Sequence, residues 1–128
     1  MDYDCLNHST SLLIYHIVLV TKYRRLILDQ IDITSVMKTI ELVSDFEIIE
    51  QEFEADHIHI MIKHKPKYSP SSFIRRIKMM STNIIWKKHP EFLKKYYWKK
   101  KILWSSGFFV CTIGNASIET IRKYIREQ

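Results

Sequence analysis

Two histidines separated by one residue, His57 and His59, stand in a segment with the residue pattern of a β-strand. Alternate residues of a strand face the same side, so both imidazoles are expected on one face about 6 to 7 Å apart, close enough to chelate one ion. Water, phosphate or another side chain would have to complete the coordination of a divalent ion. An ordinary polar face of an edge strand has the same pattern. Asp56 and His64 have the opposite parity, so Asp56 is at most a partner of a ligand.

A tyrosine and a glutamine near the C-terminus form the second candidate group. Tyr124 and Gln128 are four residues apart on an expected helix, so they share one face, next to an apolar stripe of isoleucines. The Gln128 oxygen could serve as a third metal ligand, and the Tyr124 oxygen could attack a phosphate bound to the same ion. A tyrosine with a pKa of about 10 needs a metal, a cation or a base to favour the phenolate. The alternative is a tyrosine that is half-buried beside the isoleucines.

Two other tyrosines compete with Tyr124 for the role of nucleophile. Tyr96 and Tyr97 are adjacent, so they cannot face one site together, and their aromatic surroundings indicate packing or base stacking. A tyrosine nucleophile has a chemical advantage, because the phosphotyrosine ester keeps the energy of the broken phosphodiester. Strands can then be rejoined without a nucleoside triphosphate.

The charge distribution indicates a polyanionic partner. The chain has a net charge of +6, yet residues 63–101 hold 13 basic residues against one acidic residue, whereas residues 1–62 hold 4 against 11. Such a basic block repels itself unless a polyanion lies against it, and nucleic acid is the commonest such partner. A solvated lysine-rich surface is the alternative. The residues expected to contact DNA are Lys63, Lys65, Lys67, Arg75, Arg76, Lys78, Arg122 and Lys123.

Length and composition indicate a single domain over residues 1–128. Hydrophobic residues make up 46% of the chain, with only two Gly and three Pro, as in folded proteins. Cys5 and Cys111 are too few for a disulfide framework, which favours a reducing cytosol. The N-terminus does not have the pattern of a secretory signal, and the apolar run 12–20 is too short and interrupted to span a membrane. We therefore expect a cytoplasmic protein with no membrane segment.

Alternating strands and helices would position the candidate residues. Strands are expected over residues 11–21, 46–55, 57–64 and 102–112, the last with a bend at Gly107. Helices are expected from Asp32 or Thr34 to about residue 45, from Ser69 to Pro90, and from residue 118, after a cap at Ser117, to the end. The first six elements have the β-α-β-β-α-β order of a ferredoxin-like unit, an α+β fold with a central antiparallel sheet and helices on one face. The C-terminal helix that carries Tyr124 is an addition to it.

Three segments together carry a family resemblance. They are YHIVLVTKYRR, ADHIHIMIKHKPKYSPSSFIRRIK and YYWKKKILWSSGFFVCTIGNASIETIRKYIREQ, and they span nearly the whole chain. A lone H-x-H is weak, but this combination is highly specific. It resembles the single-tyrosine HUH transposases, the TnpA-like transposases of the smallest bacterial and archaeal insertion sequences. The chain differs from that family at Gly107, where relatives more often carry a bulkier residue.

The resemblance implies a transposase that cuts and rejoins single-stranded DNA at insertion-sequence ends through a 5′-phosphotyrosine, with Mg²⁺ or Mn²⁺. It assigns the metal to His57, His59 and Gln128 and the nucleophile to Tyr124. It also implies DNA with hairpin ends as substrate, and a homodimer in which the tyrosine helix docks on the partner's histidine pair, with Gly114 as hinge. The alternatives are a related HUH replication initiator, relaxase or domesticated relative, and a non-catalytic binder of single-stranded nucleic acid.

Overall fold

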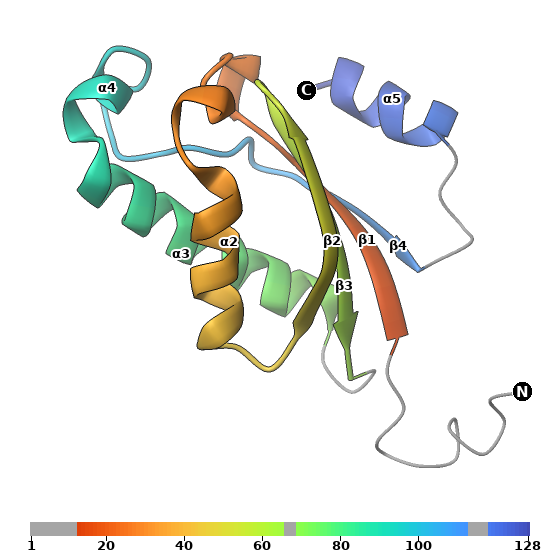
Figure 1. The fold of residues 1–128 in the computed structure, drawn as a ribbon. Coiled ribbons are helices and arrows are strands. Elements are labelled where there is room, and N and C mark those ends of the chain that lie inside the picture. Colours follow the sequence, from red (N-terminus) through yellow and green to blue (C-terminus); the bar gives the residue numbers. More distant parts are fainter. Residues whose placement is uncertain (1–12, 66–68, 113–117) are drawn as a thin grey trace, which may run out of the picture.

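An antiparallel sheet with helices on both sides forms the protein, in a computed structural model that describes residues 13–65, 69–112 and 118–128 (Figure 1). The strands lie in the spatial order β2-β3-β1-β4. Their bounds are β1 (Leu13–Val20), β2 (Glu47–Glu54), β3 (His57–His64) and β4 (Phe109–Thr112). The expected α+β architecture with an antiparallel sheet is therefore confirmed.

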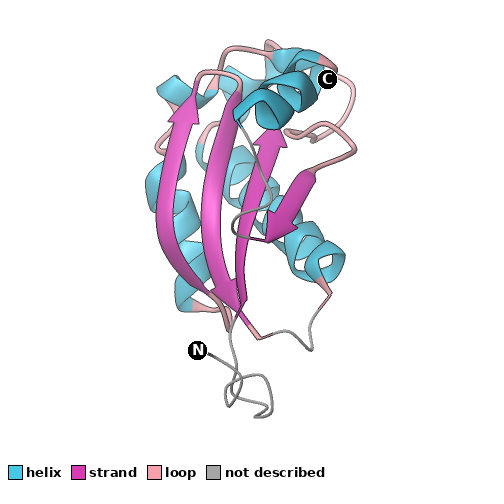
Figure 2. Cartoon of the chain, turned by 90° about the vertical axis from the view of Figure 1, so that its right-hand side faces the viewer, coloured by secondary structure: helices cyan, strands magenta, loops and turns pink. Residues whose placement is uncertain are grey.

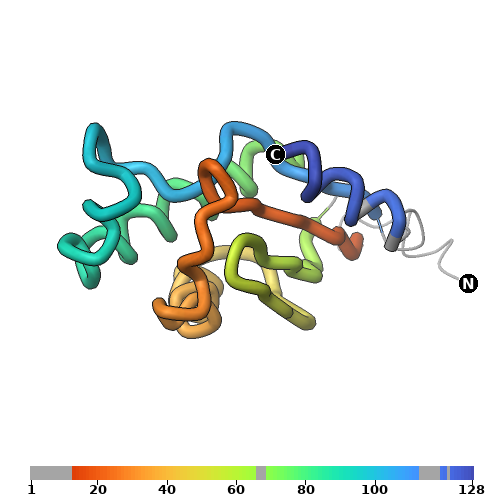
Figure 3. Tube along the Cα trace, turned by 90° about the horizontal axis from the view of Figure 1, so that it is seen from above, coloured from red at the N-terminus to blue at the C-terminus, as the bar shows by residue number. Residues whose placement is uncertain are grey.

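The helices divide between the two faces of the sheet. α2 (Ile33–Leu42) and α3 (Pro70–Lys88) cover one face, and α5 (Ile118–Arg126) crosses the other, as Figures 2 and 3 show. Short helical segments, η1 (Lys22–Arg24), η2 (Leu28–Gln30) and α4 (Pro90–Lys94), lie in the connections. The expected C-terminal helix is thus separated by the sheet from the two helices that close the core.

Side-chain caps fix where the two core helices begin. Asp32 caps α2 by accepting a hydrogen bond from the Ser35 amide, so of the two candidate caps Asp32 is the one used. Ser69 caps α3 in the same way, with Pro70 in the first turn, as the sequence predicts. α2 ends at Leu42, earlier than the expected end near residue 45.

The alternation of β3 separates the core from the candidate site. Ile58, Ile60 and Ile62 are fully buried in the core beneath α2 and α3. The intervening His57 and His59 are half-buried on the opposite face, as the period of two predicts. His64 faces the core, where its ring lies 4.7 Å from that of Phe73.

The last strand is shorter than the sequence predicts. Instead of running over residues 102–112, β4 begins at Phe109, preceded by an isolated bridge between Thr21 and Trp104. The reason lies in α3, because the Lys78 ammonium donates to the carbonyl oxygens of Ser105, Ser106 and Gly107, at 2.8, 3.2 and 3.2 Å. Carbonyls held by an ammonium do not extend the β-ladder at this point.

Some expectations fall on residues outside the described parts of the chain, namely the cap at Ser117, the hinge at Gly114 and the DNA contact at Lys67. Within the described parts, no helix combines the length and apolar character needed to cross a membrane.

Candidate metal and nucleophile site

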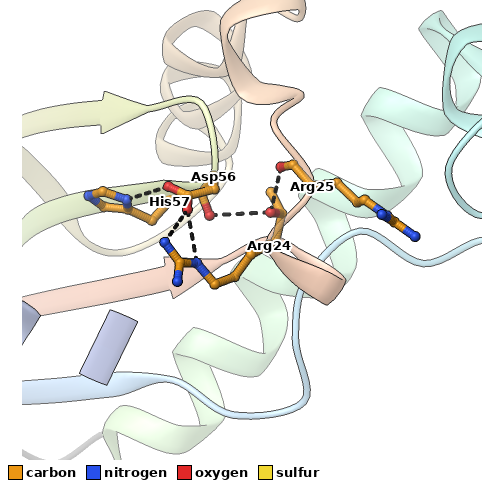
Figure 4. Close-up of polar contacts among 5 residues, drawn as sticks. Arg24, Arg25, Asp56 and His57 are labelled. Carbon is orange, nitrogen blue, oxygen red and sulfur yellow. Dashed lines mark hydrogen bonds and ion pairs between the residues drawn. The ribbon is translucent and has the colours of Figure 1, made fainter. Parts of the chain in front are cut away.

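The first half of the site is the histidine pair of β3 and the carboxylate that precedes it. Asp56 ends the β2–β3 turn, and its Oδ1 lies 2.9 Å from His57 Nδ1 (Figure 4). A carboxylate can only accept, so Nδ1 of His57 carries the proton and donates. This fixes the tautomer and leaves His57 Nε2 for an ion, the carboxylate–histidine arrangement common at metal sites.

An arginine completes this chain of contacts. The Arg24 guanidinium contacts Asp56 Oδ2 through Nε and Nη2, each at 3.1 Å (Figure 4). Burial tends to raise the pKa of Asp56, but the hydrogen bonds from His57 and Arg24 and their positive charges outweigh it and hold the pKa of Asp56 below its usual value. Asp56 is therefore ionised at neutral pH and can orient His57.

The backbone that presents Arg24 adopts an uncommon conformation. Tyr23 and Arg24 both have positive φ, 59° and 52°. Non-glycine residues in this region cost on the order of 1–3 kcal/mol each and persist only where the surroundings hold them. Here Thr21 helps to hold the turn, because its hydroxyl oxygen lies 2.8 Å from the Arg25 carbonyl and its amide donates to the Asp56 carbonyl. The strain therefore lies in the turn that carries the partner of Asp56.

A third histidine contacts the pair from the neighbouring strand. His16 of β1 places Nδ1 3.0 Å from His59 Nε2, and the two rings are stacked with centroids 5.2 Å apart. Burial lowers the pKa of His59, and the nearby His16 and His57 lower it further, against an opposing effect of Glu52 and Glu50. His59 is thus neutral at pH 7, the form that binds metal. An ion bound at His59 Nε2 would replace the His16 contact.

Acidic residues of β2 border the histidines. In the sheet register Glu52 pairs with His59 and Glu54 with His57, so these side chains share the face of the imidazoles. They give the neighbourhood a negative potential that attracts a divalent cation. Glu52 is therefore a further candidate oxygen ligand beside the pair.

The residues fit an open metal site rather than a closed one. Across residues 13–65, 69–112 and 118–128 no three His, Cys, Asp or Glu side chains gather as a ready coordination sphere. Two imidazoles with free coordination positions suit a catalytic ion that also binds water and a substrate phosphate.

The second half of the site is the tyrosine of α5. The Tyr124 ring lies against Phe109 of β4, with centroids 5.8 Å apart, and its hydroxyl is 3.5 Å from where a β-carbon on Gly107 would be. That hydroxyl is buried and has no hydrogen-bond partner in the described chain. Burial raises the pKa of Tyr124, and the nearby Ser105 hydroxyl offsets this only in part. In this position Tyr124 is a weaker nucleophile than a tyrosine in water.

Gln128 lies near Tyr124, but its side chain is bound by Ser105, in the segment that leads into β4. Its Oε1 accepts a hydrogen bond from the Ser105 hydroxyl at 3.1 Å, and its Nε2 donates to the Tyr124 carbonyl at 3.3 Å. The oxygen expected to bind metal is therefore occupied by Ser105 in this arrangement.

The two halves lie on the same face of the sheet but do not touch. His59 pairs with Val18, and Val18 pairs with Phe109. One row of residues across three strands therefore leads from the histidine pair to Phe109, whose ring lies against Tyr124. Neighbouring strands are about 4.8 Å apart, which puts the backbones of β3 and β4 about 10 Å apart. Among the described residues, Tyr124 and Gln128 share no hydrogen bond, ion pair or ring contact with His57 or His59.

The basic residues expected to contact DNA are spread over several elements. Lys65, Arg75, Arg76, Arg122 and Lys123 are exposed and Lys63 is half-buried. Lys78 differs from them, because its ammonium already serves three backbone carbonyls and burial lowers its pKa. Arg76 also donates to the Val43 carbonyl. Their role in DNA binding stays a prediction.

Sequence reasoning missed two residues of the site. His16 was visible only as a polar residue inside an apolar strand, and its pairing with His59 depends on the register between β1 and β3. Arg24 belongs to a basic cluster that gave no hint of which side chain meets Asp56.

Comparison with known proteins identifies the class. A family model described as "Transposase IS200 like" matches residues 9–128. The transposase for insertion sequence element IS200 of Salmonella typhimurium is 30% identical over 130 residues, covering 99% of this chain and 84% of the relative. The ISDra2 transposase TnpA of Deinococcus radiodurans is 26% identical over 117 residues, covering 89% and 82%.

Solved structures agree with these matches. A crystal structure of a transposase candidate from Deinococcus radiodurans matches with a TM-score of 0.82 and 25% identity, covering 91% of both chains. A REP-associated tyrosine transposase bound to a REP hairpin shares the fold, with a TM-score of 0.55 and 17% identity, covering 88% of this chain and 62% of that one. The matched proteins are transposases, enzymes that cleave and rejoin DNA. This chain belongs to the IS200-like family of tyrosine transposases.

Proposed function

We propose that this transposase cuts and rejoins single-stranded DNA at insertion-sequence ends, with Tyr124 as nucleophile beside a cation held by His57 and His59. The observation that carries the proposal is that both halves lie on one face of the sheet. Phe109, which contacts the Tyr124 ring, and His59 of the histidine pair lie in one row across β4, β1 and β3. We infer that the β-α-β-β-α-β order is a ferredoxin-like unit that serves as a platform for this face. The substrate would be DNA with hairpin ends, met in the prokaryotic cytosol.

The residues have separate tasks in the proposed reaction. Mg²⁺ or Mn²⁺ bound by the histidines would neutralise charge on the scissile phosphate. The Tyr124 oxygen forms a bond to phosphorus and loses its proton to a base or solvent, while the bond to the 3′-oxygen breaks and that oxygen takes up a proton. The products are a 5′-phosphotyrosine and a free 3′-hydroxyl, which can attack in the reverse direction. Asp56 and Arg24 hold His57 in the orientation that the ion requires.

The separation of the two halves favours a composite site made by a homodimer. Within one chain Tyr124 contacts Phe109 and Gln128 contacts Ser105, so α5 has to leave this position before either residue can approach a histidine pair. Leaving is inexpensive in one respect, since within the described chain the buried Tyr124 hydroxyl makes no hydrogen bond of ordinary geometry and would lose only its weaker interaction with the Ser105 hydroxyl. A buried polar group without such a bond costs about 1–3 kcal/mol where it is. A partner chain's histidine pair is the proposed destination. Gln128 would supply the third protein ligand of the ion, or Glu52 would do so where Gln128 does not reach it.

A covalent-adduct assay tests the chemistry. The protein would be incubated with labelled single-stranded hairpin DNA and Mg²⁺, and protein-linked label would be measured after denaturation. We expect an adduct with the natural chain and with Tyr96→Phe, but none with Tyr124→Phe. An adduct with Tyr124→Phe would refute the nucleophile assignment.

A companion variant separates cutting from binding. His57→Ala is expected to abolish the adduct and largely spare DNA binding, because Lys and Arg side chains rather than the ion neutralise most phosphates. Equal loss of binding and cutting would contradict this. DNA binding without any metal-dependent cleavage by the natural chain would favour the non-catalytic alternative.

A further inference from the structure

A second concave surface lies away from the histidine face, between the η1 turn and the segment after α4. Its lining residues include the aromatic Tyr23, Tyr96 and Trp98 and the basic Arg25, Lys99 and Lys100. We call this surface the Trp98 pocket. Its volume of about 330 Å³ falls in the range of small-ligand sites. None of the residues that line it is acidic, so its charge suits an anionic ligand.

The aromatic side chains of the pocket differ in what they contact. Tyr97 is buried, and its hydroxyl donates to the Lys22 carbonyl at 2.8 Å, which ties the 96–102 segment to the η1 turn. Tyr96 packs edge-on against Phe92. Trp98, by contrast, is 70% exposed, although a ring of this size normally buries most of its surface. Its indole is therefore the ring with a face left for a ligand.

Two cations lie near the Tyr23 ring, Arg25 among the residues that line the pocket and Lys22 beside them in η1. The Arg25 guanidinium lies 5.7 Å and the Lys22 ammonium 5.3 Å from the centre of the Tyr23 ring, within the range of cation–π attraction. Tyr23 itself is 65% exposed. Tyr23 therefore has cations beside its ring, whereas the more exposed Trp98 offers the ring on which a base could stack.

A single turn connects the pocket to the histidine face. In η1 the Arg24 side chain points to Asp56, and the side chain of the next residue, Arg25, points away from it toward the other side of the turn (Figure 4). This division falls in the turn where Tyr23 and Arg24 have positive φ. A strand held at Arg25 would thus be held by the same turn that orients His57 through Arg24 and Asp56.

We propose that the Trp98 pocket binds an unpaired nucleobase of the single-stranded DNA substrate, stacked on Trp98, with the neighbouring phosphates on Arg25, Lys99 and Lys100. An exposed aromatic face beside clustered cations is how proteins bind single strands without reading their sequence. A fully paired duplex fits less well, because its base faces are already stacked within the helix. This inference rests on the proposed function for its substrate class.

Intrinsic fluorescence offers a direct test. Trp86 and Trp104 are buried, so a ligand that stacks on an indole at the surface reports on Trp98. Short oligothymidylate and a blunt duplex of equal length would be titrated into the Tyr124→Phe protein in chelator, so that no strand is cut. We expect oligothymidylate to quench the emission and the duplex to leave it nearly unchanged. Equal quenching by both would overturn the proposal.

The affinity of variants for oligothymidylate tests the same pocket without relying on tryptophan fluorescence. Trp98→Ala should weaken oligothymidylate binding between about fivefold and a hundredfold, the usual effect of removing one stacking ring. Trp98→Phe should keep most of the affinity while losing the quench, and Leu42→Ala, an exposed apolar residue at the end of α2, should change neither. Unchanged affinity in Trp98→Ala would refute the pocket. The Tyr124 adduct is scored in a separate assay, so either idea can fail alone.

Discussion

The carboxylate of Asp56 meets the His57 ring at Nδ1, 2.9 Å away, and this contact decides which nitrogen of His57 can bind metal. Arg24 binds the other oxygen of the same carboxylate. The three side chains come from two segments of the chain, a strained turn and the start of β3. The orientation of one proposed ligand thus depends on a residue 33 positions earlier.

Loss of the Asp56 carboxylate is therefore expected to weaken metal binding. Asp56→Asn should lower the affinity for Mn²⁺ by about 10- to 100-fold, the usual effect of removing a residue that orients a metal-binding histidine. Mn²⁺ titration followed by electron paramagnetic resonance measures this, with Asp29→Asn, an exposed carboxylate of η2, as control. In the metal-free natural protein, nitrogen NMR should show the Nδ1–H tautomer of His57. Equal Mn²⁺ affinity in Asp56→Asn and the natural chain would show that Asp56 does not act on the ligand.

The sequence predicted the parts of this site that depend on local periodicity. Strict alternation put His57 and His59 on one face of β3, and a Ser-Pro pair marked the start of α3. It could not predict the partners of these histidines, because His16 reaches His59 only through the β1–β3 register. Nor could it predict the short β4, which begins only after the carbonyls of residues 105–107, where the ammonium of Lys78, 27 residues earlier than Ser105, binds the backbone.

The surface that Tyr124 contacts depends on packing between segments that are far apart in the sequence. An i, i+4 pattern placed Tyr124 and Gln128 on one face of a helix that was expected to run to the last residue. In the structure α5 ends at Arg126, so Gln128 lies beyond the helix and stays near Tyr124 through its side-chain amide. Which surface that face meets was not determined by the pattern. In this chain it is Phe109 and Ser105 of its own β4 side rather than a histidine pair.

Gly107 leaves room for the Tyr124 hydroxyl, so the size of residue 107 should control how firmly α5 is held. Gly107→Ala would place a β-carbon at an ordinary contact distance of 3.5 Å and should be tolerated. Gly107→Leu should push the Tyr124 ring off Phe109 and loosen α5. Hydrogen exchange of the α5 amides is the measurement, and we expect clearly faster exchange in Gly107→Leu than in Gly107→Ala. Identical exchange in the two variants would mean that this contact does not hold α5.

His64 is expected to make the fold sensitive to acid. Burial between aromatic rings lowers the pKa of His64, and its Nδ1 accepts a hydrogen bond from the Lys65 amide that protonation would break. Below the unfolded pKa of about 6.5 the unfolded chain therefore binds the proton more readily, and the free energy of unfolding falls as the pH falls.

Urea unfolding of metal-free protein at about pH 7.5 and about pH 5.5 measures this effect on either side of the unfolded pKa. The loss of stability between the two pH values should be smaller in His64→Gln, which cannot titrate, than in the natural chain. A variant that loses as much stability on acidification as the natural chain would rule out His64 as a source of the sensitivity.

Mixing two inactive variants tests most directly whether Tyr124 acts at the histidine pair of another chain. Tyr124→Phe and His57→Ala would be unfolded together, refolded as a mixture and assayed for the covalent DNA adduct with Mg²⁺. In a symmetric dimer with composite sites, each mixed dimer joins one intact tyrosine to one intact histidine pair, so roughly a quarter of the natural adduct is expected. No adduct in the mixture, with both variants folded and dimeric, would contradict a site shared between two chains.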